Sequence, residues 1–209
     1  MNRRHGHHLQ TSIPEMDMDD IGIVRQFEPE YSQSIYAEML IDELVIGNYL
    51  NIKNLSILSI SSHQRTKAIM LMSHMNEAMG FKADTLYVSA SIMDKYLINL
   101  SSRNKKAPCL VTLAITCVMI AAKLESSDHV SFSRMSKFLD KHHGIKIFRK
   151  SFRQLEKEVL TVLDFSVVYV SPIAFLERYE RIFDVDMKAD KEANEISIEA
   201  QKLCLLMLE

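Results

Sequence analysis

The chain has 209 residues, of which 47% are hydrophobic and 25% charged, a composition typical of one globular domain or of one domain and part of another. Its formal net charge is −2 and its pI is near 6.5, so the chain as a whole does not attract nucleic acid, and we expect no direct nucleic-acid partner. It holds only five glycines and four prolines, and few segments alternate apolar and polar residues. We therefore expect an all-α protein.

Residues 1–28 carry mixed charge and little periodicity, and we expect them to form a disordered or extended tail. Their histidines at positions 5, 7 and 8 could hold a metal loosely, but a flexible tail is the simpler interpretation. No apolar segment follows the opening MNRRHGHHLQ, so we expect no secretory signal.

Apolar residues recur with the spacing of a helix through the rest of the chain. The first predicted helix places Ile35 and Met39 on one stripe, and the glycines at 47, 80 and 144 are expected at helix ends. The predicted helices are Glu30–Ile46, His63–Met79, Ala83–Leu100, Pro108–Leu124, Phe132–Lys141, Ile147–Phe165, Pro172–Phe183 and Lys191–Leu208.

The segment 109–122 carries no charge and could be a membrane span or the innermost helix of a globular domain. A span needs about 20 largely apolar residues, and this run is shorter and has lysines on both sides. Because a helix that is apolar all round must be surrounded by protein, we expect a buried helix and no membrane association. Cys109, Cys117 and Cys204 are interpreted as reduced core residues of an intracellular protein, in the nucleus and/or the cytoplasm.

Charge and histidine clusters follow this segment. Between Arg134 and Lys157 the chain carries eight Lys/Arg against two acidic residues, which we interpret as a solvated face. Asp140, His142 and His143 could bind a metal, but adjacent histidines on a helix point about 100° apart, so we expect no metal site. The sequence has no Gly-rich phosphate loop, no G-x-S-x-G and no H-E-x-x-H motif, and we expect neither a catalytic residue nor a cofactor.

Several motifs between residues 28 and 183 fall in a recognisable order. Arg65 opens the segment RTKAIMLMSHMNEAMG, and Thr85-Leu86 and Asp94-Lys95-Tyr96-Leu97 follow it, then AAKLES at 121–126 and FRQLEKEVLTVLDFSV at 152–167. In order and separation these motifs resemble the cyclin box. EPEYSQSIYAEML at 28–40 resembles the helix that precedes the box in A- and B-type cyclins.

The resemblance implies an organisation for the chain. Residues 29–62 would form an N-terminal helix and a connection, and residues 63–165 a cyclin box in which four helices surround the apolar one. Residues 166–209 would form a linker and the first helices of a second box. Only 44 residues follow Phe165, where a second box would need roughly ninety, so either the sequence is truncated or the second box is partial and is completed by a partner.

The resemblance also implies a function without catalysis: a regulatory subunit that binds a cyclin-dependent kinase and activates it by positioning the kinase's C-helix and activation loop. Lys123 and Glu156 would hydrogen-bond to kinase backbone. The apolar contact area around them would come from Leu124, Leu160, Phe165 and Val167.

Other positions bear on structure and on substrates. The resemblance implies that Arg65 and Asp94 pair and fix one helix of the box against the next. Cyclins that dock substrates directly carry Met, Leu and Trp on an exposed patch, and those positions read Gln64, Ala68 and Leu71 here, so we do not expect docking there. The alternative function is a cyclin-fold scaffold or adaptor that does not activate a kinase.

Overall fold

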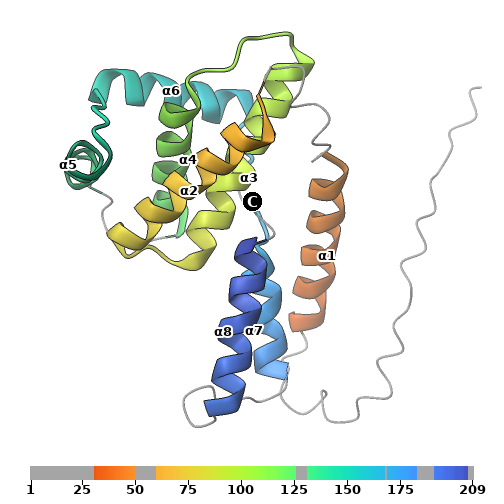
Figure 1. The fold of residues 1–209 in the computed structure, drawn as a ribbon. Helices are drawn as coiled ribbons and strands as arrows, with labels where there is room; N and C mark the ends of the chain where they lie inside the picture. Colours follow the sequence, from red (N-terminus) through yellow and green to blue (C-terminus); the bar gives the residue numbers. More distant parts are fainter. Residues whose placement is uncertain (1–30, 50–59, 126–130, 168, 183–190, 207–209) are drawn as a thin grey trace, which may run out of the picture.

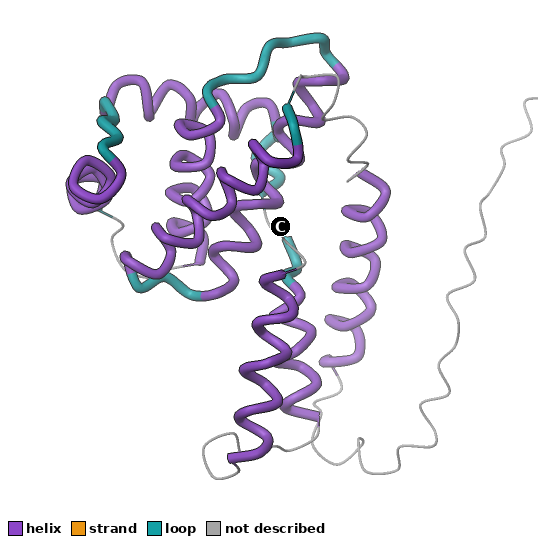
Figure 2. Tube along the Cα trace, viewed as in Figure 1, coloured by secondary structure: helices purple, strands orange, loops and turns teal. Residues whose placement is uncertain are grey.

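The computed structural model describes residues 31–49, 60–125, 131–167, 169–182 and 191–206. Within these residues the chain forms eight α-helices and no strand, which confirms the predicted all-α fold (Figures 1 and 2). The predicted tail lies outside the described residues. The helices are α1 (Tyr31–Tyr49), α2 (Ser62–Met79), α3 (Ala83–Ser102), α4 (Leu110–Glu125), α5 (Phe132–His143), α6 (Arg149–Val162), α7 (Pro172–Ile182) and α8 (Lys191–Leu206).

Local sequence signals set several of these helix ends. Ser61 caps α2 through a capping box, in which its hydroxyl accepts from the Gln64 amide at 3.2 Å and its own amide donates to Gln64 Oε1 at 2.9 Å. Gly80 and Gly144 end α2 and α5 with φ of 71° and 65°, a left-handed conformation that glycine adopts without strain. Gly47 does not end a helix, because α1 continues to Tyr49.

The apolar helix α4 is the centre of the box, packed against α2, α3 and α6 (Figure 1). Its residues 113–122 are all buried, which confirms the predicted buried helix. No helix among the described residues is long and apolar enough to span a membrane. Cys117 is buried as expected, but Cys109 precedes the helix and is exposed, so the prediction that it is a core residue is wrong.

Most of the predicted helical stripes face the core. In α2 and α3 the apolar residues that recur at helical spacing are buried, apart from the half-buried Met79: Ile69, Met72, Met75, Leu86, Ala90, Met93 and Leu97. Two residues expected on apolar stripes are exposed: Ile35 of the first predicted helix, and Phe148, which the helix predicted at 147–165 would place on one face with Phe152, Leu155 and Val159. Phe148 is 72% exposed because α6 begins one residue later and the extended backbone of Phe148 takes its side chain off the helical face. Ile35 is 48% exposed on α1.

Helices α1, α7 and α8 lie beside the box (Figure 1). The ring of Tyr36 in α1 meets Phe175 of α7 edge to face, with ring centroids 6.2 Å apart, and the Arg178 guanidinium lies 4.2 Å from the centroid of Tyr36. Helix α7 contacts α3 of the box and α8. Aromatic packing on α7 therefore holds α1, which precedes the box in sequence, near the helices that follow it.

Candidate functional site

Two charged side chains meet where α4 and α6 pack together. Lys123, in the last turn of α4, forms an ion pair with the Glu156 carboxylate of α6. The Lys123 side chain is 47% exposed and that of Glu156 is 18% exposed. The ammonium also lies 5.7 Å from the centre of the Phe152 ring. The lysine thus leaves the buried helix with its charge at the surface and its partner already in place.

The predicted apolar contact residues lie on the same two helices or in the turn after α6. Leu124 is 46% exposed and Phe165 is 68% exposed, while Leu160 is half-buried against the core. Val167 is only 5% exposed and belongs to the core, so the prediction that it supplies contact area is wrong. Of the predicted apolar contact residues, Leu124 and Phe165 are thus the most exposed.

An unusual turn after α6 separates Phe165 from Val167. The helix ends at Val162, three residues earlier than predicted, and Asp164 and Phe165 then adopt φ of 50° and 57°. The Phe165 amide donates to the Leu160 carbonyl at 2.9 Å, and the Val167 amide donates to the Phe165 carbonyl at 3.0 Å. Left-handed φ is unfavourable for residues with a Cβ, and no glycine marks this turn in the sequence. Sequence reasoning therefore missed it.

Lys95 of α3 holds the same turn, a role that sequence reasoning also missed. Its ammonium donates to Ser166, at 3.3 Å from the hydroxyl and 3.5 Å from the carbonyl oxygen, and lies 5.1 Å from the centre of the Tyr169 ring. Burial lowers the pKa of Lys95. The neighbouring Tyr96 hydroxyl donates to Glu158 of α6 at 3.0 Å, and burial raises the pKa of Tyr96. These contacts fix α6 and the turn that carries Phe165 to α3.

Arg65 of α2 and Asp94 of α3 form a bidentate ion pair. Arg65 Nε donates to Asp94 Oδ1 at 3.0 Å, and Nη2 donates to Oδ2 at 2.8 Å. The side chains are 16% and 8% exposed, and the hydrogen bond to Asp94 raises the pKa of Arg65. This geometry joins the first two helices of the box.

The other positions that were considered in the sequence lie on α2 and α5. Gln64 and Ala68 line a hollow of about 410 Å³ beside the start of α4, and Leu71 is half-buried. His143 stacks on His74 of α2 with ring centroids 5.8 Å apart, while His142 is exposed. Among the residues that the structure describes, no group of three or more His, Cys, Asp and Glu is arranged to hold a metal ion.

Comparison with known families decides which fold this helical arrangement represents. The family model described as "Cyclin, N-terminal domain" matches residues 35–168. The chain belongs to the cyclin family. The predicted resemblance and the predicted cyclin-box fold are thus confirmed. Members of this family are regulatory subunits without catalytic groups of their own.

Several curated cyclins are similar to this one. S-phase entry cyclin-5 of Saccharomyces cerevisiae is 27% identical over 172 residues, which cover 82% of this chain and 37% of that protein. Cyclin-D5-1 of Arabidopsis thaliana is 23% identical, with 83% and 53% of the two chains covered. G2/mitotic-specific cyclin-B1 of Oryzias javanicus is 23% identical, with 85% and 42% covered. This cyclin thus spans about half or less of the length of these relatives.

Proposed function

We propose that this cyclin binds and activates a cyclin-dependent protein kinase, by holding the kinase's C-helix inward and its activation loop out of the active site. The observation that carries the proposal is the Lys123–Glu156 ion pair at the end of α4, with Leu124 exposed next to Lys123 in the chain and Phe165 exposed in the turn after α6. Membership of the cyclin family and the similarity to S-phase and mitotic cyclins support it.

The ion pair has hydrogen-bonding capacity left for a partner. An ammonium has three donors and a carboxylate about four acceptor positions, and the bond between Lys123 and Glu156 uses one of each. The remaining donors suit backbone carbonyls, and the remaining acceptors suit the free amides at a helix start. Because the two side chains already hold each other in place, less side-chain entropy is lost when a partner binds.

Activation by such a surface needs a differential contact. A kinase works when its β3 lysine pairs with the glutamate of its C-helix, which requires the inward position of that helix. Shifting the ratio of inward to outward C-helix from 1:99 to 99:1 requires about 5.5 kcal/mol. Covering the exposed parts of Leu124 and Phe165 contributes about 2–3 kcal/mol, at about 1.5–3 kcal/mol for a fully exposed side chain. Bonds to Lys123 and Glu156 supply the remainder if only the inward C-helix reaches them.

The test is the double substitution Lys123→Ala, Glu156→Ala. Truncating the pair removes hydrogen bonds within the interface, and we expect a loss of about 2–5 kcal/mol of affinity. Copurification of a kinase from native extract, and the associated phosphorylation of a generic substrate, should both disappear. The thermal midpoint should change little, because the double substitution removes both charges together and leaves no buried charge without its partner.

A matched control removes another ion pair of the same type. Lys202 and Glu199 on α8 are paired at 2.6 Å with side chains 59% and 67% exposed, and their double alanine variant should keep both the kinase and its activity. A scaffold would behave differently: wild type would copurify partners without kinase activity, and the Lys123→Ala, Glu156→Ala variant would retain them. That pattern would refute the proposed activation.

A further inference from the structure

Charge is distributed unevenly along this chain. Residues 134–157 hold eight Lys/Arg and two acidic residues, a net charge of +6, whereas the whole chain has a net charge of −2. The rest of the chain therefore carries −8. One of the two acidic residues in the segment, Glu156, is already paired with Lys123. Helices α5 and α6 thus concentrate positive charge on a protein that is otherwise acidic.

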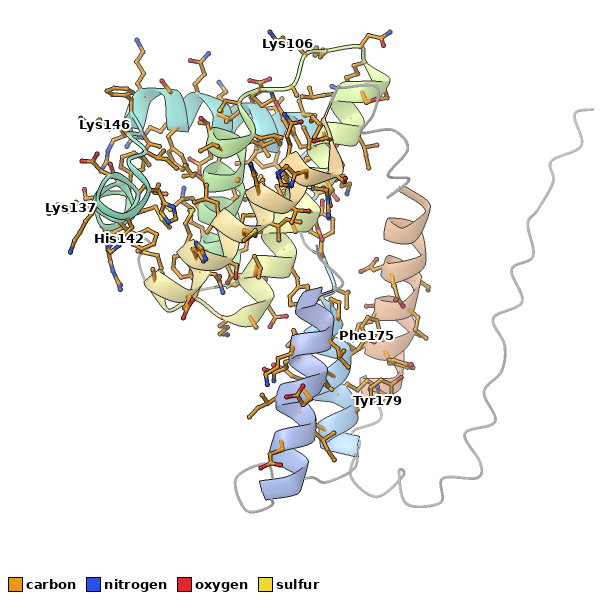
Figure 3. All side chains as sticks on the ribbon, viewed as in Figure 1. Lys106, Lys137, His142, Lys146, Phe175 and Tyr179 are labelled. Carbon is orange, nitrogen blue, oxygen red and sulfur yellow. The ribbon has the colours of Figure 1, made fainter. Side chains whose placement is uncertain are left out.

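The structure shows where these cations lie. On α5, Arg134, Lys137 and Lys141 fall at spacings of three and four, on the face opposite the buried Met135 and Leu139. The basic residues that follow are also exposed: Lys146, Arg149, Lys150, Arg153 and Lys157. Figure 3 shows Lys137, His142 and Lys146 pointing outward at the α5 end of the box.

These cations are not neutralised within the described parts of the chain. Ion pairs there include Arg65–Asp94, Lys123–Glu156 and Lys202–Glu199, and no ion pair seen in the described residues involves a basic residue of segment 134–157. Arg134 donates to the Ala78 carbonyl at 3.4 Å, which leaves its charge without an anionic partner. Arg149 instead lies 4.8 Å from the centre of the Phe132 ring. Exposed positive charges that are close together in the chain and are not neutralised raise the local concentration of an anionic partner.

An aromatic ring lies within this basic segment. Phe148 is 72% exposed, the highest value among the exposed large hydrophobic residues of the described chain, and its sequence neighbours include Lys146 and Arg149. Its position before the first residue of α6 keeps the ring off the core. An exposed ring among unpaired cations suits a partner that brings both negative charge and an apolar side chain.

We propose that the α5–α6 basic surface, made of Lys137, Lys141, Lys146, Lys150 and Phe148, binds an extended acidic segment of a partner protein. Carboxylate or phosphorylated side chains of the segment meet the lysines, and one apolar side chain meets Phe148. This site is separate in residues from the Lys123–Glu156 surface and does not depend on kinase binding there.

The observations favour an acidic peptide over nucleic acid. The rest of the chain has a net charge of −8, which repels a long nucleic acid with its many phosphates. A short acidic peptide contacts only the basic surface. Binding of single strands usually uses several exposed rings on which successive bases stack. Here Phe148 is exposed, while Phe132, Phe138 and Phe152 are half-buried or buried.

Fluorescence anisotropy with the full chain at low ionic strength tests the proposal. The probes are a labelled peptide with glutamates on both sides of one phenylalanine, a version with phosphoserine for glutamate, a neutral glutamine version, and a single-stranded oligonucleotide of equal charge. We expect both acidic peptides to bind and the glutamine peptide not to bind. The stronger of the two acidic peptides identifies which anion the surface prefers. Adding salt should weaken binding, because the lysines are exposed.

Substitutions then locate the site. Lys137→Gln, Lys141→Gln, Lys146→Gln together should weaken peptide binding about tenfold or more, since three exposed charge contacts are lost. Phe148→Ser should weaken binding of the phenylalanine peptide. It should not change the binding of a further peptide in which alanine replaces that phenylalanine. Thermal unfolding of both variants checks that the fold is retained.

The control variant removes the same charge elsewhere. Arg103→Gln, Lys105→Gln, Lys106→Gln neutralises three exposed basic residues between α3 and α4, and should change peptide affinity by less than about twofold. Equal weakening by the control would show that only net charge matters, and would overturn the proposal. Absence of acidic-peptide binding, or equal or tighter binding of the oligonucleotide, would overturn it as well.

Discussion

Replacing Arg65 with alanine should lower the free energy of unfolding by about 3–5 kcal/mol, the cost of leaving a buried charge without its partner. Asp94 accepts two hydrogen bonds from the guanidinium, and its side chain is only 8% exposed, so water has little access to replace them. Domains of ordinary stability unfold at a cost of about 5–15 kcal/mol. The loss is thus a large fraction of the total.

Urea unfolding followed by far-ultraviolet circular dichroism measures this change. For a chain of this size about 2–4 °C of thermal midpoint corresponds to 1 kcal/mol, so the midpoint should fall by about 6–20 °C. The double variant Arg65→Met, Asp94→Leu should recover much of the loss, because it removes both charges and keeps apolar volume.

The reference for this experiment is an exposed ion pair. Lys202→Ala breaks the pair with Glu199 on α8, where the side chains are 59% and 67% exposed, and should change stability by less than about 1 kcal/mol. An Arg65→Ala effect as small as that of Lys202→Ala would refute the reasoning, since it would mean that the Asp94 carboxylate is solvated in the folded protein.

Two further predictions concern cysteine reactivity and a helix end. A thiol reagent should label Cys109 quickly and Cys117 only after unfolding: Cys109 is exposed and hydrogen bonds from Thr112 lower its pKa, whereas Cys117 is buried and burial raises its pKa. Cys109→Ser should remove the fast phase, and fast labelling of Cys117 in native protein would contradict its place in the core. Gly144→Ala should destabilise the protein by about 1–2 kcal/mol in urea unfolding because φ is 65°, although no atom lies within 4 Å of the added Cβ. Gly144→Asn should cost less, because asparagine tolerates this conformation, and equal stability of the alanine variant would refute the strain argument.

Much of the box could be predicted because local patterns carried the signal. The apolar segment 109–122 predicts a buried helix, because a helix that is apolar on all sides must be surrounded by other helices in a globular chain. Gly80 and Gly144 marked helix ends by the conformation that only glycine adopts freely. Most predicted helix boundaries lie within two residues of the observed ones, apart from α1 and α6.

The site was less accessible to the same reasoning. Lys123 and Glu156 were predicted to face a partner. They are 33 residues apart in the sequence, and their pairing with each other depends on how α4 packs against α6. Phe165 is exposed and Val167 is buried because the turn between them and α6 has left-handed φ at two residues that carry a Cβ, Asp164 and Phe165. Lys95 hydrogen-bonds to Ser166 in that turn, 71 residues later in the sequence, and the spacing of apolar residues does not predict a contact of this kind.

By itself, the sequence determined that this protein is helical, which helix is innermost, and that its motifs follow the order of a cyclin box, because apolar spacing, caps and motif order are properties of the linear chain. Tertiary structure decided which apolar residues near the site stay exposed, since Leu124 and Phe165 remain at the surface while Val167 is buried. It also decided that the basic residues of segment 134–157 stay exposed and, within the described residues, without an ion pair. Exposure and ion pairing depend on which helices lie against each other, and long-range packing alone sets that arrangement.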